Sequence, residues 1–142
     1  MSPELLHADA VARWTPAGWR GVLITGASGA GKSDLALRLI GQPGWRLVAD
    51  DYAHVFASGG ALYATAPTTI AGRIEARGAG LLPVRRRDLV RLVLIVELTA
   101  EALERLPEPD PAMIERVMLP TVRLNPFEAS AAQKVTRLTG PL

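Results

Sequence analysis

The chain has 142 residues, a formal net charge of +2 and no cysteine, and 49% of its residues are hydrophobic. These values are typical of a folded domain, so we expect residues 1–142 to form a single domain without disulfides or thiolate metal sites. No apolar run approaches the ~20 residues of a membrane-spanning helix. The segment Met1–Asp9 carries acidic residues and no basic, apolar signal segment, so we expect a cytoplasmic protein without a membrane partner.

The charge pattern gives little support to a nucleic-acid partner. The net charge of +2 is small, and the chain has only 2 tyrosines and 2 phenylalanines to interleave with basic residues. The one local basic cluster, Arg85–Arg87, is typical of a solvated turn before a strand, although a contact with phosphate or an acidic partner stays open. We therefore expect no nucleic-acid binding.

The first predicted elements are a strand over residues 21–25 and a helix over residues 33–41. Between them lies Gly26–Ser33, which fits the pattern G-x-x-x-x-G-K-[ST] of a phosphate-binding loop. A glycine-rich turn before an ordinary helix is the alternative. The strand before the loop and the helix after it are the context that the motif requires, so the sequence predicts a phosphate site at this junction.

Each residue type of this loop has a role in phosphate binding. The glycines allow backbone N–H groups to point at phosphate oxygens, and the following helix adds the positive end of its dipole. Lys32 would reach the β- and γ-phosphates, and the Ser33 hydroxyl would bind Mg²⁺. Of the 16 basic residues only Lys32 and Lys134 are lysines, and a point charge suits a phosphate contact. The expected nucleotide-binding residues are Gly26, Ala27, Ser28, Gly29, Ala30, Gly31, Lys32 and Ser33.

A second polar feature follows the next predicted strand, residues 45–49. Asp50 and Asp51 stand at its carboxyl end, where open α/β sheets bind ligands. Adjacent side chains of an extended segment point to opposite sides, so one carboxylate would serve Mg²⁺ and the other would accept the proton of an attacking hydroxyl. The alternative interpretation is that the two residues only begin a turn.

The remaining pattern alternates between short strands and short helices. We expect a hairpin over 52–63 that turns at Ser58-Gly59-Gly60, a short helix over 70–76, an extended piece over 81–84, a strand over 89–98, a short helix over 100–106, strands around 113–119 and 121–124, and a weak helix over 128–138. This order predicts an α/β fold around a mixed sheet, of the kind found in kinases with a phosphate-binding loop.

Three segments occur together in a characteristic order. They are Gly21–Ser33, then Arg46-Leu47-Val48-Ala49-Asp50-Asp51, then Ile74-Glu75-x-Arg77-Gly78-x-Gly80. In this order they resemble the catalytic domain of the HPr kinase/phosphorylase family, in a short form without the N-terminal domain. That family phosphorylates a serine of HPr, the phosphocarrier of the sugar phosphotransferase system, and many members reverse the reaction. The resemblance covers about His7 to Leu106, and it implies ATP as phosphoryl donor and Mg²⁺ as cofactor.

The resemblance also implies roles for individual residues. Asp50 would be the catalytic base, and Lys32 would be catalytic as well as phosphate-binding. His7 and Arg105 correspond to a histidine and an arginine of the family and would also take part in catalysis. Taken alone, these two would be an ordinary N-terminal histidine and a surface arginine of a helix. The implied metal residues are Ser33, Glu75 and Asp51.

The chain departs from the family in segments that other activities need. The stretch Pro120–Asn125 keeps only the proline of the family segment tied to dephosphorylation, so we do not carry the phosphorylase activity over. We expect the C-terminal helices that grip HPr and build the family's hexamer to be missing or reduced, which leaves a homo-oligomer open. Without the resemblance, Glu75–Arg77 would be a helix end before a glycine cap.

Three functions remain open on the sequence. The leading one is a Mg²⁺-dependent, ATP-using protein serine kinase that acts on an HPr-type phosphocarrier. The second is a small-molecule kinase, in which Arg85–Arg87 would be an arginine-rich lid over the nucleotide. The third is a non-catalytic sensor of ATP or phosphate, and the retained Asp50 argues against it because binding alone would not need that carboxylate.

Overall fold

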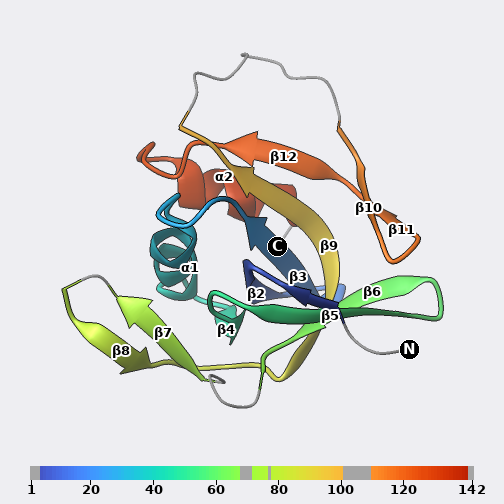
Figure 1. The fold of residues 1–142 in the computed structure, drawn as a ribbon, viewed down its shortest axis with the longest axis horizontal. Helices are drawn as coiled ribbons and strands as arrows, with labels where there is room; N and C mark the ends of the chain where they lie inside the picture. Colours follow the sequence, from blue (N-terminus) through green and yellow to red (C-terminus); the bar gives the residue numbers. More distant parts are fainter. Residues whose placement is uncertain (1–3, 68–71, 77, 101–109, 141–142) are drawn as a thin grey trace.

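The computed structural model describes residues 4–67, 72–76, 78–100 and 110–140 (Figure 1). Its elements in chain order are β1 (Glu4–Leu6), β2 (Ala8–Thr15), β3 (Gly18–Thr25), α1 (Lys32–Ile40), β4 (Trp45–Ala49), β5 (Ala53–Ser58), β6 (Ala61–Thr65), β7 (Arg73–Ala76), β8 (Gly80–Pro83), β9 (Leu89–Leu98), β10 (Ala112–Ile114), β11 (Val117–Leu119), β12 (Thr121–Leu124) and α2 (Ala131–Leu138). No helix in the described part of the chain is long and apolar enough to span a membrane.

The strands are organised around one mixed sheet. Within the described ranges, eight strands form this sheet in the order β1-β5-β6-β9-β3-β2-β4, and β12 also pairs with β9. Strand β9 runs parallel to β3 and β12, and the other neighbours are antiparallel. The first residues of β9 pair with β6 and its last residues with β12, so the sheet curls along this strand. The predicted mixed sheet is confirmed.

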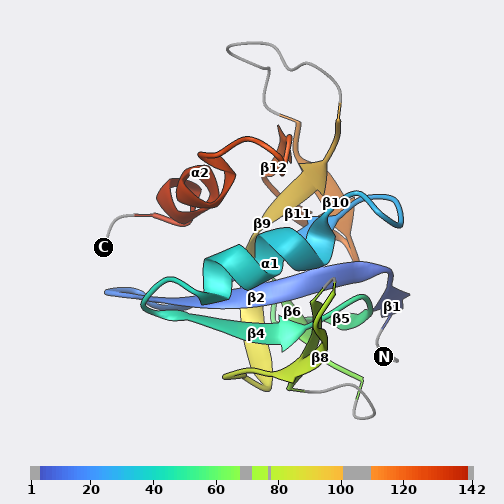
Figure 2. The same ribbon diagram turned by 90° about the vertical axis from the view of Figure 1, so that its left-hand side faces the viewer.

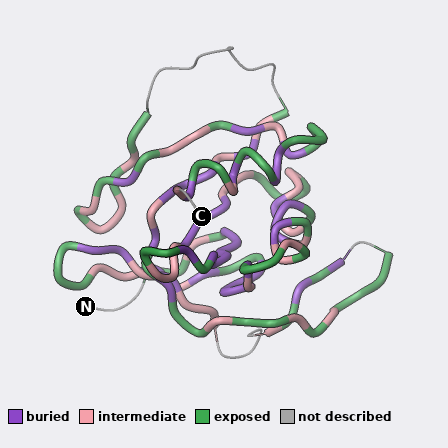
Figure 3. Tube along the Cα trace, turned by 180° about the vertical axis from the view of Figure 1, so that it is seen from behind, coloured by how far each residue is buried: buried purple, intermediate pink, exposed green. Residues whose placement is uncertain are grey.

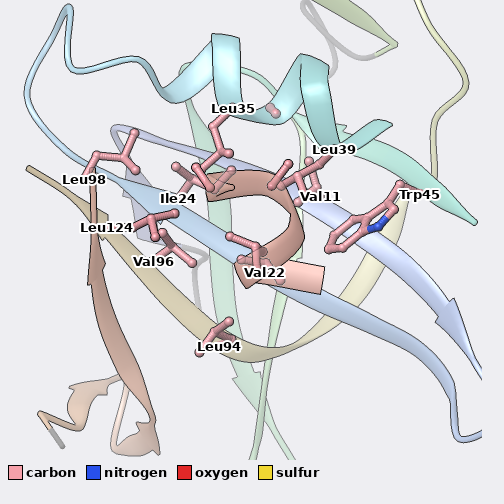
Figure 4. Close-up of a cluster of buried hydrophobic side chains, with 14 of the residues drawn as sticks. Val11, Val22, Ile24, Leu35, Leu39, Trp45, Leu94, Val96, Leu98 and Leu124 are labelled. Carbon is pink, nitrogen blue, oxygen red and sulfur yellow. The ribbon is translucent and has the colours of Figure 1, made fainter. Parts of the chain in front are cut away.

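Strand β3 shows how one segment serves both halves of the core. Val22 and Ile24 pack against Leu35 and Leu39 of α1 on one face (Figure 4), whereas Leu23 packs on the opposite face with β5 and β6. Side chains of a strand alternate between faces, and both faces of this strand are covered. Its apolar run is therefore continuous. Figure 3 shows the buried positions gathered along the central strands and the inner sides of the helices.

The two helices lie on the same face of the sheet. Figure 2 shows α1 lying over β2 and β4, with α2 next to it. Leu35 and Leu39 of α1 and Ala131 and Val135 of α2 are fully buried in one cluster. This packing fixes the start of α1 at the end of β3, which is where the phosphate loop lies.

Residues 73–76 correct one prediction, because they form a strand and not the end of a helix. Strand β7 pairs antiparallel with β8, so Ile74 is buried and Glu75 is exposed. The glycine that suggested a helix cap, Gly78, has φ +82° in the hairpin turn. A glycine with positive φ suits both a helix cap and a hairpin turn. The burial of Ile74 against distant segments favours the strand and its hairpin.

Other elements extend or refine the expected order. Residues 4–15, for which we predicted no strand, form β1 and β2, and residues 113–119 belong to the hairpin β10–β11. The last strand, β12, pairs with β9. The final helix begins at Ala131, after the expected start at residue 128. The predicted helix over 100–106 falls almost entirely outside the described residues.

Candidate functional site

The phosphate loop lies between the end of β3 and the start of α1, as predicted. Gly31, the residue before the helix, has φ +101°, and a Cβ atom there would lie 3.1 Å from Cγ of Pro126. A side chain at this position would be strained in both conformation and space. No side chain caps α1. The first N–H groups of the helix therefore remain suited to an anion, which the helix dipole also favours.

Lys32 turns back onto the loop that precedes it. Its Nζ donates hydrogen bonds to the carbonyl oxygens of Gly26 at 3.1 Å and Ala27 at 3.2 Å. The residue is only 6% exposed, so its charge lies inside the loop rather than in solvent. A phosphate in the loop would replace neutral carbonyl partners with charged oxygens, and such charge-assisted bonds are stronger.

Asp50 joins the loop to two other elements. Its Oδ1 accepts the Ser33 hydroxyl at 2.6 Å, and its Oδ2 accepts the backbone N–H of Glu75 at 2.8 Å. The residue is 7% exposed and follows β4 directly. The phosphate loop, the end of β4 and β7 therefore meet at one carboxylate. This arrangement brings together three predicted site residues that are far apart in the sequence.

Asp51 points to a different partner from its neighbour. Its Oδ1 lies 2.7 Å from Nε2 of His7, and the His7 ring also contacts Tyr52 with 5.1 Å between ring centroids. The two adjacent aspartates thus point to different sides, with Asp50 at the loop and Asp51 at the histidine. The predicted cause was an extended strand, but β4 ends at Ala49 and the left-handed backbone of Asp51, with φ +68°, separates the two side chains. The structure places His7 at the edge of the predicted site.

A cavity of about 490 Å³ opens above the loop, which is within the usual range for small-ligand sites. It is lined by residues of the loop, the aspartate turn and the β7–β8 hairpin, and by one exposed aromatic ring that the sequence analysis did not single out. These lining residues include Ser28, Lys32, Ser33, Asp51, Glu75 and Phe127.

The cavity lining fits a magnesium ion held together with nucleotide phosphates. In the described part of the chain, no group of three or more His, Cys, Asp or Glu residues could enclose a metal ion. Mg²⁺ typically uses one or two carboxylates, keeps several waters and takes its other ligands from phosphates. Asp51, Glu75 and the hydroxyl-bearing Ser33 line one cavity and provide such a partial set. When bound, Mg²⁺ would neutralise charge that develops on the phosphates.

Asp9 is a buried member of the site that the sequence analysis missed. It lies on β2, is fully buried, and accepts the Asp51 backbone N–H on Oδ1 at 2.9 Å. Burial is the main cause that raises the pKa of Asp9 from its usual 3.8 to about 9, and the hydrogen bond and negative charge of the neighbouring Asp50 carboxylate contribute to the same increase. The Asp51 amide and the Lys32 charge oppose these effects. Asp9 lies only two residues after His7, but no sequence spacing connects it to Asp50.

This raised pKa predicts how the stability of the metal-free protein depends on pH. Folded Asp9 keeps a proton, with a pKa of about 9, that an unfolded aspartate loses near 3.8. Its contribution to stability is therefore complete below pH 3.8 and is lost as the pH rises towards 9. We expect Asp9→Asn to flatten the fall of Tm between roughly pH 5 and 8, measured in chelator. Identical slopes for both proteins would show that Asp9 does not hold the proton.

The remaining predicted residues are Arg105 and the basic cluster Arg85–Arg87. Arg105 lies outside the described residues. Arg85–Arg87 runs beside β4 instead of over the phosphate loop, with the Arg87 N–H bonded to the Leu47 carbonyl at 2.9 Å. The Arg87 guanidinium lies 4.7 Å from the ring centroid of Trp19, near the end of β3 that is remote from the loop. The structure therefore gives no support to an arginine-rich lid.

Comparison with known proteins agrees with this geometry. The family model described as HPr Serine kinase C-terminal domain matches residues 18–104, which is more than half of the chain. HPr kinase/phosphorylase of Leptothrix cholodnii is 44% identical over 94 residues, covering 60% of this chain and 29% of that protein. The protein of the same name from Bordetella pertussis is 42% identical over 102 residues, covering 63% and 33%. The matches thus span about a third or less of the relatives' own length.

A solved structure shows the same fold over nearly the whole chain. The structure of the Hpr(Ser) kinase/phosphatase from Coxiella burnetii superimposes with a TM-score of 0.77 and 24% sequence identity. The alignment covers 95% of this chain and 97% of that chain. The predicted fold class, an α/β domain of the HPr kinase catalytic type with a mixed sheet, is confirmed.

Proposed function

The chain belongs to the HPr Serine kinase C-terminal domain family, and on this premise we propose that it transfers the γ-phosphoryl group of ATP to a serine of an HPr-type phosphocarrier. The names of its relatives support a kinase of this kind. The observation that carries the proposal is the hydrogen bond of 2.6 Å between Ser33 and Asp50. It sets a carboxylate beside the hydroxyl that the loop motif associates with Mg²⁺ and the γ-phosphate.

The reaction assigns one task to each part of the site. The loop N–H groups and Lys32 bind the β- and γ-phosphates. Ser33, Asp51 and Glu75, which line the cavity, would hold Mg²⁺, and the ion would offset negative charge on the phosphates. The carrier's serine oxygen attacks the γ-phosphorus as the bond to the β,γ-bridging oxygen breaks and ADP leaves. Asp50 accepts the proton of the attacking hydroxyl. Positioning and charge stabilisation provide most of the rate enhancement.

The His7–Asp51 pair completes the proposed site. The contact of 2.7 Å between His7 Nε2 and Asp51 Oδ1 holds the Asp51 carboxylate at the cavity, whose lining includes Asp51. His7 is therefore proposed to act through Asp51 and not on the nucleotide loop. Arg105 is proposed to stabilise the charge of the transferring group, as the family resemblance implies.

Labelling of an acceptor panel tests the proposed function. The protein, Mg²⁺ and γ-labelled ATP are mixed with an HPr-type phosphocarrier, with a carrier whose target serine is replaced by alanine, with a mixture of small hydroxyl-bearing metabolites, and with no acceptor. Acid-stable label on the first carrier alone is the expected result. ATP binding without transfer to any acceptor would favour the nucleotide-sensor function, and transfer only to a metabolite would favour a small-molecule kinase.

A further prediction isolates the Glu75 side chain. Glu75→Gln leaves the backbone N–H that bonds to Asp50 in place and removes only the carboxylate that lines the cavity. We expect about a 10- to 100-fold increase in the Mg²⁺ concentration needed for half-maximal transfer. Mg²⁺ titrations of both proteins measure this change, with Glu115→Gln in the β10–β11 turn as the matched control. An unchanged titration would remove Glu75 from the metal site.

A further inference from the structure

Asp9 is a fully buried carboxyl group that the proposed reaction does not use. It pairs with Ile24 of β3 in the register of the sheet, and the next residue, Ala10, pairs with Ala49 at the end of β4. It therefore lies directly beside the point where β4 ends and the aspartate turn begins. Its Oδ2 is buried without a hydrogen-bond partner among the described residues. Burial of an unpaired carboxyl oxygen costs desolvation free energy that an apolar side chain would not cost. The presence of an aspartate at this position therefore needs a functional reason.

The turn next to Asp9 has an unusual backbone. Asp51 has φ +68°, in the left-handed region that few residues other than glycine adopt. This conformation separates the two carboxylates, so that Asp50 faces Ser33 and Asp51 faces His7. A turn of this kind persists only where its surroundings hold it.

Besides the side-chain bonds of Asp50 and Asp51, two hydrogen bonds among the described residues involve backbone N–H groups of the turn. One is local, from the Tyr52 N–H to the Asp50 carbonyl at 2.8 Å. The other runs from the Asp51 N–H to Oδ1 of Asp9 at 2.9 Å, across 42 positions of the sequence. The second connects the turn to β2, a strand that is paired on both sides. One of these partners is β3, which leads directly into the phosphate loop, so this bond ties the turn to the strand before the loop.

We propose that Asp9 is a positioning residue, whose side-chain oxygen holds the Asp51 amide and thereby keeps Asp50 facing Ser33. Asp9 is fully buried on β2 and its side chain bonds to the Asp51 backbone, so it acts through the turn and not on the substrate. Its effect on catalysis rests on the proposed function, whereas its effect on the turn does not. The role requires an acceptor oxygen of the right length at this position and does not require a negative charge.

Two variants of Asp9 distinguish a role as hydrogen-bond acceptor from a role in packing alone. Asp9→Asn has the same shape and keeps an oxygen for the Asp51 N–H, while its amide N–H group can donate to the Asp50 carboxylate. Asp9→Ala removes the acceptor. We expect kcat for phosphoryl transfer to fall at least about 10-fold in Asp9→Ala with little change in KM for ATP, and the Asn variant to restore most of it.

A measurement without ATP tests the same claim independently of activity. Hydrogen exchange of the Asp51 amide, followed by NMR, should be slow in the wild-type protein and in Asp9→Asn and fast in Asp9→Ala. Wild-type exchange and kcat in Asp9→Ala would overturn the proposal, as would an Asn variant as impaired as the Ala variant. Asp9→Ser, which keeps a shorter acceptor, takes the place of the Ala variant should that one not fold, with an intermediate exchange rate expected. If wild-type protein transfers no phosphoryl group, the proposed function fails while the exchange experiment still decides the role of Asp9.

Discussion

Replacement of Lys32 by alanine is expected to lower phosphoryl transfer by at least about 100-fold, to background level in a standard assay. In the structure its Nζ is held within the loop by the carbonyls of Gly26 and Ala27. That position is suited to a phosphate, and no other lysine lies in the loop. The loss should appear in kcat, because the ammonium group stabilises charge that grows on the transferring phosphoryl group.

The chain offers a matched control for this variant. Lys134, the other lysine, lies on α2 and forms an exposed ion pair with Glu128 at 2.6 Å. Exposed pairs of this kind contribute little, so Lys134→Ala should transfer phosphate at the wild-type rate. Initial rates under saturating Mg²⁺ and ATP measure both variants. Turnover at the wild-type rate in Lys32→Ala would contradict the assignment of the phosphate site.

The second large effect is expected for Asp50→Asn. Removal of a general base typically costs about 100- to 10,000-fold in rate. The asparagine side chain keeps one oxygen and nearly the same volume, so it can still accept one of the two hydrogen bonds that Asp50 makes with Ser33 and Glu75. ATP binding should therefore be largely retained while transfer is lost. Calorimetric titration with ATP and single-turnover rates measure the two properties separately.

Asp51→Asn is the control that separates the two adjacent carboxylates. Asp51 lines the cavity and contacts His7, so its replacement should weaken Mg²⁺ binding and the His7 contact without removing the base. A high Mg²⁺ concentration should therefore restore transfer in Asp51→Asn and not in Asp50→Asn. The opposite pattern would assign the base to Asp51 and leave Asp50 as an orienting group for Ser33.

The parts of the fold that were predicted correctly are those with local signals. The loop Gly26–Ser33 combines glycines, a lysine and a serine at fixed spacing, and the apolar run of β9 has its limits at Leu89 and Leu98 as expected. The hairpin β5–β6 turns where Ser58-Gly59-Gly60 indicated. In each case residues close together in the sequence determine the local structure.

The parts that were missed depend on contacts between distant segments. Strand β7 was predicted as helix because its four residues show no strand pattern in the sequence. Their alternation between exposed and buried side chains appears only in the structure, where β7 pairs with β8. Asp9 lies in a run of small residues whose partners are on β3 and β4, and its bond to Asp51 spans 42 positions. The His7–Asp51 contact was likewise not predicted, although both residues were named as candidates for the site. Spacing identified the residue types of this site, and the pairing of strands decided which of them meet.

The most direct test of the account is a time course of acid-stable label on the serine of an HPr-type phosphocarrier, with γ-labelled ATP and Mg²⁺, for the wild-type protein and Asp50→Asn side by side. The account predicts that label accumulates with the wild-type protein, and that the Asp50→Asn variant binds ATP but leaves the carrier unlabelled. Equal labelling by the two proteins would contradict the role of Asp50 in the reaction. Absence of label with a wild-type protein that binds ATP would contradict the proposed kinase activity itself.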